Sequence, residues 1–298
     1  IQPAIDLAEC GFSITEREAN RLNSLQSQLE KLNTTLPVFC KKTPWKAGDT
    51  LIQKDLANTL KRMRDKGKAG FYEGPTAAYI VNEMERGGGI ISLADLKNYK
   101  ALFRTPIQFD YEGFTVLSMP PPSSGGILVQ QMLKMLEDRP LPSYGFQTAK
   151  SVQLITEVER RSYADRAEHL GDPDFYKVPI KEMVSPSYLA RRMADYDSTR
   201  ASISAKITAG VIKESLETTH LSVMDAAGNA VSVTTTLNGG YGSKVVVGGA
   251  GFFLNNEMDD FSVQPGEPNM FGAIGGVANA IAPGKRMLSS MTLTIVLK

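Results

Sequence analysis

The sequence is poor in the residue types that build metal and nucleic-acid sites. Its 298 residues include 2 histidines, His169 and His220, and 2 cysteines, Cys10 and Cys40. These are too few or too far apart for a metal centre, so we expect neither a metal nor a cofactor. The net charge of +1, with no long block of one sign, gives no basic face for nucleic acid. No apolar stretch approaches the ~20 residues of a membrane span. Whether the cysteines pair stays open.

Two common enzyme signatures are also missing. No G-x-S-x-G elbow occurs, which leaves an α/β-hydrolase without its nucleophile. The glycines of residues 239–242 are not followed by Gly-Lys-Ser/Thr, and no strand-loop-helix glycine fingerprint occurs, which counts against a nucleotide-binding α/β protein. The chain starts at Ile1, with no initiator methionine or signal peptide, as expected of a processed chain or a fragment.

Hydrophobic periodicity predicts a helical first third and a β-rich last third. Helical spacing occurs over residues 3–8, 16–32, 56–66, 76–85, 152–169 and 187–195, with a capping box at Ser92 and Asp95 and a helix from Ser-Ser-Gly-Gly to Leu136. Alternation predicts a hairpin over 107–119, a second over 220–237, and strands at 245–247, 251–254 and 290–297. Residues 261–281 are expected to be a long loop.

The stretch ESLETTHLSV, residues 214–223, poses the central question of catalysis. Thr218 and Thr219 lie where the second hairpin begins, and β-branched residues are ordinary there. A threonine hydroxyl is a poor nucleophile without a base beside it. His220 shares a strand face with Thr218, but adjacency does not make it a base. Cleavage of the Glu217–Thr218 bond would instead free an α-amine that titrates near ~8 and can accept a proton.

Three other segments each allow a plain and a functional interpretation. NNEMDDF, residues 255–261, is either a solvated acidic turn or a site for a cationic group. The serines of LSSM, residues 288–291, either precede a strand or donate hydrogen bonds to a carboxylate. Ser123-Ser124-Gly125-Gly126 is either a helix cap or an anion site. The plain interpretation is favoured for each segment alone.

Taken together and in order, the segments resemble the γ-glutamyltransferases (γ-glutamyltranspeptidases) of the N-terminal-nucleophile hydrolase superfamily. The resemblance runs over the whole chain and is carried by FYEGPTAAYIVNEM, MPPPSSGGILVQQML, YADRAEHLGDPDF, ETTHLSVMDAAGNAVSVTTTLN, FFLNNEMDDFSVQPGEPN and RMLSSMTLTIV. It implies an α+β fold, the four-layer αββα sandwich, here truncated at both ends. It also implies a precursor that cuts itself into two subunits. Residues 1–217 would be the C-terminal portion of the large subunit and 218–298 the N-terminal portion of the small one, together forming one structural domain.

The resemblance also implies residue roles. Thr218 would attack the Glu217 carbonyl during processing and then the γ-carbonyl of glutathione or another γ-glutamyl compound, and water, an amino acid or a peptide would accept the acyl group. Thr236 would orient the nucleophile. The remaining roles are binding of the α-ammonium by Asn238, Glu257 and Asp260, binding of the α-carboxylate by Ser289 and Ser290, and a lid that includes Phe271.

The departures from the family pattern concern the lid, the last strand and the ends. Phe271 stands where a tyrosine is common, and Leu293 where proline is usual. Family chains extend further on both sides, where an arginine that clamps the α-carboxylate and a Gly-Gly oxyanion hole are expected. This chain alone is therefore expected to be unprocessed and inactive. The rival functions are a poly-γ-glutamate hydrolase, an acylase of the same superfamily and a non-catalytic domain. A periplasmic or extracellular location is implied by the resemblance alone.

Overall fold

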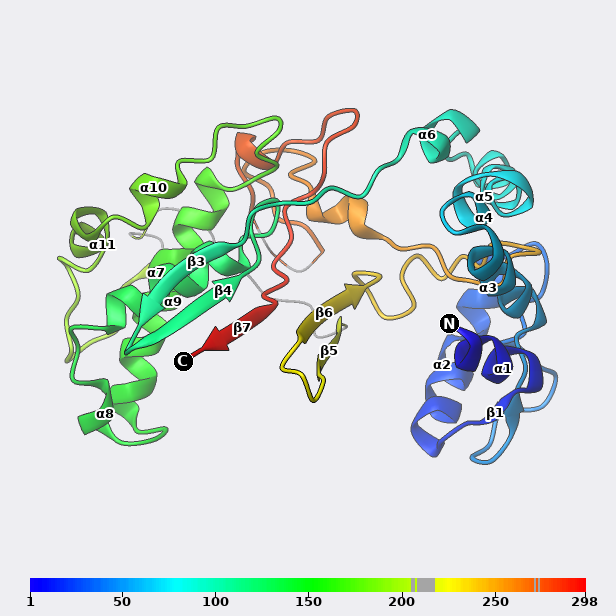
Figure 1. The fold of residues 1–298 in the computed structure, drawn as a ribbon, viewed down its shortest axis with the longest axis horizontal. Coiled ribbons are helices and arrows are strands. Elements are labelled where there is room, and N and C mark those ends of the chain that lie inside the picture. The colour runs from blue at the N-terminus through cyan, green and yellow to red at the C-terminus, as the bar shows by residue number, and fades with distance from the viewer. Residues whose placement is uncertain (205–206, 208–217, 271, 273) are drawn as a thin grey trace. The chain divides into compact units, whose positions relative to one another are not determined.

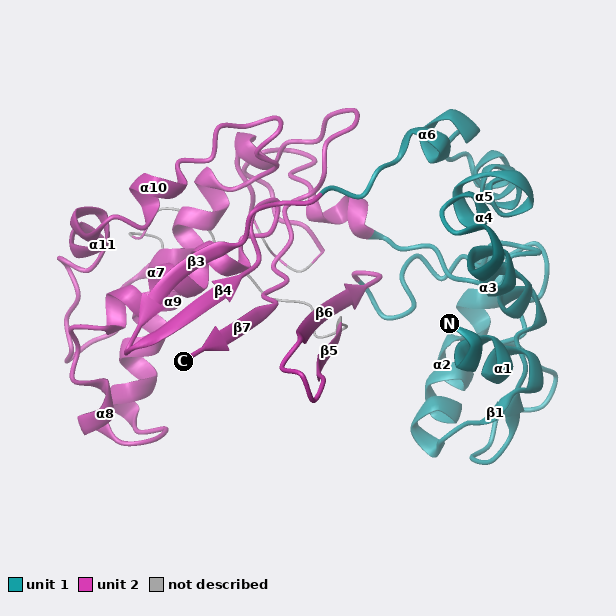
Figure 2. Cartoon of the chain, in the orientation of Figure 1, with its two compact units in different colours: residues 1–102, 239–256 teal, residues 103–238, 257–298 magenta. Residues whose placement is uncertain are grey.

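The computed structural model describes the chain except for residues 205–206, 208–217, 271 and 273. Helices and antiparallel sheets coexist (Figure 1), which confirms the expected α+β class. The described residues form two compact units, residues 1–102 with 239–256 and residues 103–238 with 257–298 (Figure 2). Each unit draws residues from both predicted subunit portions, and the division into subunits stays a prediction.

Unit 1 is mainly helical, as the periodicity predicted. Its elements are α1 (Gln2–Cys10), β1 (Phe12–Ser13), α2 (Glu16–Leu32), β2 (Thr50–Leu51), α3 (Lys54–Lys66), α4 (Ala69–Tyr72), α5 (Gly74–Gly87) and α6 (Leu93–Asn98). Helix α6 begins with the predicted capping box, in which Ser92 and Asp95 bond each other's backbone N–H groups. Buried side chains of α2, among them Leu22 and Leu29, pack with Trp45 in one core cluster.

Residues 239–256 return to unit 1 from far along the sequence. The Asn33 side chain, after α2, donates to the Lys244 carbonyl and accepts from the Val246 N–H. Phe39 stacks on Phe253 with ring centroids 4.7 Å apart. The strands expected at 245–247 and 251–254 are wrong, because only a single antiparallel bridge joins Val246 to Phe253. Residues 239–256 are held by packing against the helices of unit 1, in place of a longer β-ladder.

Unit 2 is built on a three-stranded antiparallel sheet. Its elements are β3 (Ile107–Tyr111), β4 (Phe114–Ser118), α7 (Gly125–Leu136), α8 (Leu141–Tyr144), α9 (Ala149–His169), α10 (Ile180–Met183), α11 (Pro186–Arg192), β5 (Thr218–Met224), β6 (Ala230–Thr236), the 3₁₀ turns η2 (Glu257–Asp260) and η3 (Val277–Asn279), and β7 (Thr294–Leu297). The strand order is β3-β4-β7, and β7 is shorter than the strand expected at 290–297. Helix α7 contacts both β3 and β4 and packs on α9 (Figure 1).

The second predicted hairpin is confirmed as β5 and β6, which form a sheet of their own. A turn closes it, with the Asp225 carboxylate accepting from the N–H groups of Ala227 and Asn229. The paired residues Leu221 and Val233 are about half exposed on one face. Of the four expected layers, the described residues of unit 2 thus supply one helical layer, one three-stranded sheet and this hairpin.

The helical layer of unit 2 contains a buried ion-pair network. Glu157 and Arg161, four residues apart on α9, are each 1% exposed. Arg161 bonds Glu157 at 2.5 Å and Asp195 at 2.7 Å. The paired charges satisfy one another, as buried charges must.

The two cysteines are not bonded to each other, since Cys10 is an exposed thiol and Cys40 a buried one. Burial raises the pKa of the Cys40 thiol, and the negative charge of Glu30 adds to this effect. Both thiols lie in unit 1. Within the described part of the chain, no helix is long and apolar enough to cross a membrane.

Candidate active site

The predicted nucleophile lies at the first position of the β5–β6 ladder. The antiparallel register pairs Thr218 with Thr236, the residue predicted to orient it. Such directly opposed residues have Cα atoms ~4.5–5.5 Å apart. Two residues past the strand, Asn238 is buried and has a left-handed φ of 71°. Its N–H donates to the Thr236 hydroxyl at 2.9 Å, which fixes the turn after the strand. The backbone register therefore places Thr218 opposite Thr236, which bonds Asn238.

His220 lies on the same face of the hairpin as Thr218, as predicted. Its Nδ1 is 2.8 Å from the Thr234 hydroxyl, and its Nε2 is 3.1 Å from that of Ser222. Hydroxyl groups of its own hairpin thus hold the ring. Two other predicted residues, Glu217 and Phe271, lie outside the described residues.

The predicted carboxylates share the short turn η2, where both are half-buried. Burial raises the pKa of Glu257 to about 7, and the negative charge of Asp260 adds to the effect. Burial also raises the pKa of Asp260 to about 6, with the Arg166 charge opposing it and the Asp259 charge adding to it. Desolvated carboxyl groups of this kind gain most from a cationic ligand, which restores the charged form.

The predicted serine pair is held by the start of α7. The Ser289 carbonyl accepts from the Ser124 N–H at 2.8 Å and from the Ser124 hydroxyl at 2.9 Å. The Ser123 hydroxyl donates to the Met291 carbonyl at 2.6 Å. Ser124 occupies the cap position but its side chain makes no capping bond, whereas the Ser123 hydroxyl accepts from the Gly125 N–H at 3.3 Å, so the favoured cap interpretation holds for Ser123 and not for Ser124. The hydroxyls of Ser123 and Ser124 instead bind a segment more than 160 residues away.

Sequence analysis missed Arg166, which lies within the quoted segment YADRAEHLGDPDF on α9. Arg166 is 9% exposed, and its guanidinium donates from Nη2 to the Ser290 hydroxyl at 2.9 Å and from Nε to the Ser124 hydroxyl at 3.0 Å. It is also close enough to Asp260 to affect the pKa of that carboxyl. An arginine on a helix gives no signal of these contacts, because they join residues 42 and 124 positions apart.

A second missed residue, Asn279, bridges the carboxylate turn and the serine pair. This buried side chain donates from Nδ2 to the Asp260 carbonyl at 2.7 Å and accepts at Oδ1 from the Leu288 N–H at 2.9 Å. Buried Asp172 also holds the segment before Ser289, because its carboxylate accepts from the Arg286 N–H at 2.9 Å. Asp260 and the segment before Ser289 are therefore joined by direct side-chain bonds.

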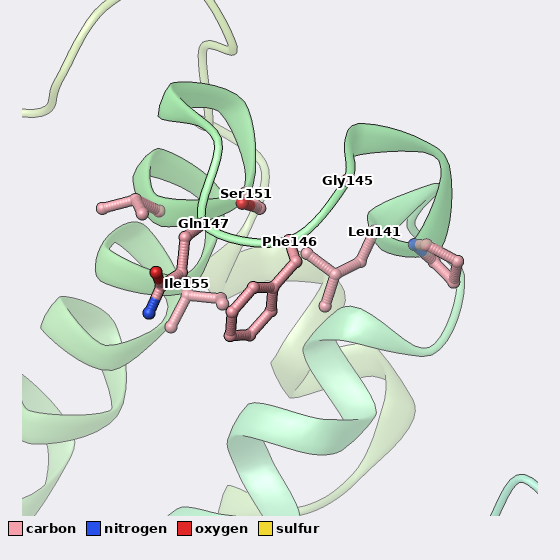
Figure 3. Close-up of a pocket in the computed structure, with 8 residues that line it drawn as sticks. Leu141, Gly145, Phe146, Gln147, Ser151 and Ile155 are labelled. Atoms are coloured by element: carbon pink, nitrogen blue, oxygen red, sulfur yellow. The ribbon is translucent and has the colours of Figure 1, made fainter.

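An apolar surface pocket of ≈ 310 Å³ lies elsewhere in unit 2 (Figure 3). It is formed around α8 and the start of α9 by Leu141, Pro142, Gly145, Phe146, Gln147, Ser151, Val152 and Ile155. None of these is a predicted site residue, and the lining carries no ionisable group.

The arrangement offers both halves of an amino-acid binding site. Glu257 and Asp260 are acceptors suited to an ammonium group, whereas Ser289 and Ser290, beside the Arg166 charge, are donors suited to a carboxylate. These groups fit a ligand with an α-amino-acid head.

Comparison with known proteins indicates the family of the chain. The family model for gamma-glutamyltranspeptidase matches residues 1–298. The glutathione hydrolase proenzyme of Escherichia coli (strain K12) is 46% identical over 303 residues, which cover 100% of this chain and 52% of the relative. The acylase ACY 1 proenzyme of Pseudomonas sp. (strain SE83) is 36% identical, covering 100% of this chain and 51% of its own.

A solved structure agrees with the sequence comparisons. The crystal structure of Helicobacter pylori gamma-glutamyltranspeptidase is 34% identical, with a TM-score of 0.66 over 70% of this chain and 60% of that one. The chain thus spans about half the length of the curated relatives it matches.

Proposed function

The chain belongs to the gamma-glutamyltranspeptidase family, and we propose that the whole protein is a glutathione hydrolase and γ-glutamyltransferase with Thr218 as its nucleophile. The observation that carries the proposal is the register of the β5–β6 hairpin, which pairs Thr218 with Thr236 directly. A family match identifies a motif, and the register supports it because the backbones of the two threonines lie opposite each other in the ladder.

Processing would come first. The Thr218 hydroxyl attacks the Glu217 carbonyl carbon, the acyl group moves from nitrogen to oxygen, and water hydrolyses the resulting ester. The products are a carboxylate on Glu217 and a free α-amine on Thr218. That amine titrates near ~8 and can accept the hydroxyl proton in the next step. Processing would yield the large and small subunits as a heterodimer.

Turnover would use the same hydroxyl. Thr218 attacks the γ-carbonyl of glutathione or a related γ-glutamyl compound, and the departing amine takes up the proton. The γ-glutamyl ester is then released to water, an amino acid or a peptide. Through both steps Glu257, Asp260 and Asn238 would bind the α-ammonium, and Ser289 and Ser290 the α-carboxylate. A periplasmic or extracellular location is part of the proposal and follows from the resemblance alone.

An acylase is the second candidate, favoured by the 36% identity to the acylase ACY 1 proenzyme. Glu257 and Asp260 argue against it for donors that lack an ammonium group, because such a ligand brings no positive charge to offset the desolvation of these two half-buried carboxyl groups. The two functions therefore differ in their need for the donor's α-ammonium.

The test uses the full-length protein. Intact mass after incubation at neutral pH should show a new terminus at Thr218, and the processed protein should hydrolyse L-γ-glutamyl-p-nitroanilide much faster than glutaryl-p-nitroanilide, which lacks the ammonium. Thr218→Ala should abolish cleavage and activity, while Thr219→Ala should retain both. Uncut mass in the full-length protein would overturn the proposal, and a preference for the glutaryl donor would favour the acylase.

A further inference from the structure

Arg166 links the two halves of the candidate site. Its side chain is buried, and two of its hydrogen bonds end on the hydroxyls of Ser290 and Ser124. One bond reaches Ser290 itself. The other reaches Ser124, whose hydroxyl in turn donates a hydrogen bond to the Ser289 carbonyl. A single guanidinium thus fixes the side chain of one serine and, through Ser124, the backbone of the other.

The hydrogen-bond inventory explains what this contact does to Ser290. A serine hydroxyl has one proton to donate and two lone pairs to accept with. Arg166 donates to Ser290 Oγ at 2.9 Å and occupies one lone pair. The hydroxyl proton cannot point back at the guanidinium, so it is left to donate to another acceptor. Donation from a charged group also polarises the hydroxyl and strengthens the bond it makes in turn.

The charge of Arg166 acts in the same direction. A buried guanidinium next to the serine pair favours an anion there, because charges interact more strongly away from bulk water. Arg166 also lowers the pKa of Asp260 against the effect of burial, which favours the carboxylate form that binds an ammonium. Both effects suit one zwitterionic ligand.

We propose that Arg166 is a positioning residue that orients the Ser290 hydroxyl toward the donor's α-carboxylate and, through Ser124, holds the Ser289 backbone in place. The inference rests on the proposed function, because it assumes a γ-glutamyl donor in this site. Arg166 acts through the serines and takes no part in the bond changes at Thr218. Its loss should therefore weaken binding of donor and transition state alike, raising KM more than it lowers kcat.

The experiment is a double-mutant cycle in the full-length, processed protein, with L-γ-glutamyl-p-nitroanilide as donor. The variants are Arg166→Met, Ser290→Ala and the pair. Each single variant should raise KM by ~10-fold or more with kcat within ~3-fold of wild type, as expected for a charge-assisted hydrogen bond. If Arg166 acts through Ser290, the two substitutions should not act independently. The KM of the double variant should then be at least ~5-fold lower than the value obtained by multiplying the KM increases of the two single variants.

A matched control separates positioning from stability. Arg160 lies on the same helix and also makes an ion pair and a backbone bond, to Glu157 and to the Ser202 carbonyl. Arg160→Met should lower the melting temperature while leaving KM within ~2-fold of wild type. Arg166→Lys keeps the charge and one donor, so it should recover part of the KM, and it replaces Arg166→Met in the cycle if that variant does not process.

The outcomes are distinguishable. A wild type that does not turn over the donor contradicts the proposed function itself. If wild type is active, two results overturn the role of Arg166 and leave the proposed function standing. One is a double variant whose KM increase equals the product of the two single increases, and the other is an unchanged KM in processed Arg166→Met.

Discussion

The raised pKa of Glu257 makes a prediction that a neutral substitution can test. Glu257→Gln keeps the shape of the side chain and removes its charge. Burial, and then the charge of Asp260, raises the pKa of Glu257 to about 7, so wild type gains or loses the carboxylate within the ordinary assay range. The variant has no such transition. We therefore expect the penalty of the substitution to depend on pH.

The magnitude follows from the fraction ionised. Near pH 8 a group with a pKa of about 7 is roughly 90% ionised, and the lost charge-assisted bond to the donor's ammonium is worth ~1.5–3 kcal/mol, or ~10- to 150-fold in kcat/KM. At pH 5.5 only about 3% of wild type carries the charge. The ratio of kcat/KM in wild type to kcat/KM in the variant should therefore fall by up to ~10-fold per pH unit below 7 and approach ~1–5.

The assay is kcat/KM for L-γ-glutamyl-p-nitroanilide from pH 5 to 8 at constant ionic strength. Titration of the Thr218 amine affects both proteins equally and cancels in the ratio. Glu182→Gln, at an exposed site of the same unit, is the control and should give a flat ratio near 1. A ratio for Glu257→Gln that is the same at pH 5.5 and 8 would refute the reasoning.

Stability offers an independent check of the same pKa. A carboxyl whose pKa rises on folding, from 4.5 to about 7 here, stabilises the fold fully below pH ~4.5 and loses that contribution as the pH rises through about 7. The glutamine variant has no charge to desolvate. Without ligand, its melting temperature should exceed that of wild type at pH 8, and the difference should shrink or reverse near pH 5.

Three further predictions concern the packing that supports the site and the units. Asn279→Ala removes both bonds of the bridging amide and leaves buried backbone groups unsatisfied, so the melting temperature should fall by the equivalent of ~1–3 kcal/mol and the donor KM should rise, as calorimetry and steady-state kinetics would show; an unchanged KM would argue against the bridge. Leu29→Ala should cost ~2–5 kcal/mol in urea unfolding because Leu29 is fully buried, whereas Leu32→Ala, at a 40% exposed site on the same helix, should cost little, and equal losses would contradict the assigned core. Arg161→Met should cost up to ~3–5 kcal/mol because buried Glu157 would keep only the more exposed Arg160 as its ion-pair partner, and adding Glu157→Met should restore part of the melting temperature; additive losses would show that the pair is not coupled.

Local patterns predicted the local structure well. The alternation over 220–224 and 230–237, with Asp225 and Gly228 between, predicted the β5–β6 hairpin and placed Thr218 at its start. The capping box at Ser92 predicted where α6 begins. These features depend on residues close in sequence, whose preferences and spacing are visible without the fold.

The same local patterns did not predict the long-range contacts. The apolar residues at 245–247 and 251–254 indicated strands, but tertiary packing against α2 and α5 decided their structure. The division into two units also depends on residues 239–256 joining the N-terminal helices. Neither follows from periodicity, because a strand pattern does not say what covers it.

The candidate site shows the same limit in its chemistry. The motif named the groups that would meet a ligand, Glu257, Asp260, Ser289 and Ser290, because acceptors and donors for an amino-acid head are recognisable as residue types. The groups that hold them were not recognisable, since Arg166 and Asn279 are common residues that matter only through their partners.

The supporting bonds also explain how an irregular segment can present an ordered site. Ser289 and Ser290 lie outside the named strands, and Ser289 makes only an isolated parallel bridge to Ser123. Side chains add to this backbone pairing: the Ser124 hydroxyl bonds the Ser289 carbonyl, and Asn279 bonds the Leu288 N–H. Each bond satisfies a polar group and fixes a position at once. Substitutions at these supports should therefore change donor affinity before they unfold the unit, whereas a core substitution should do the reverse.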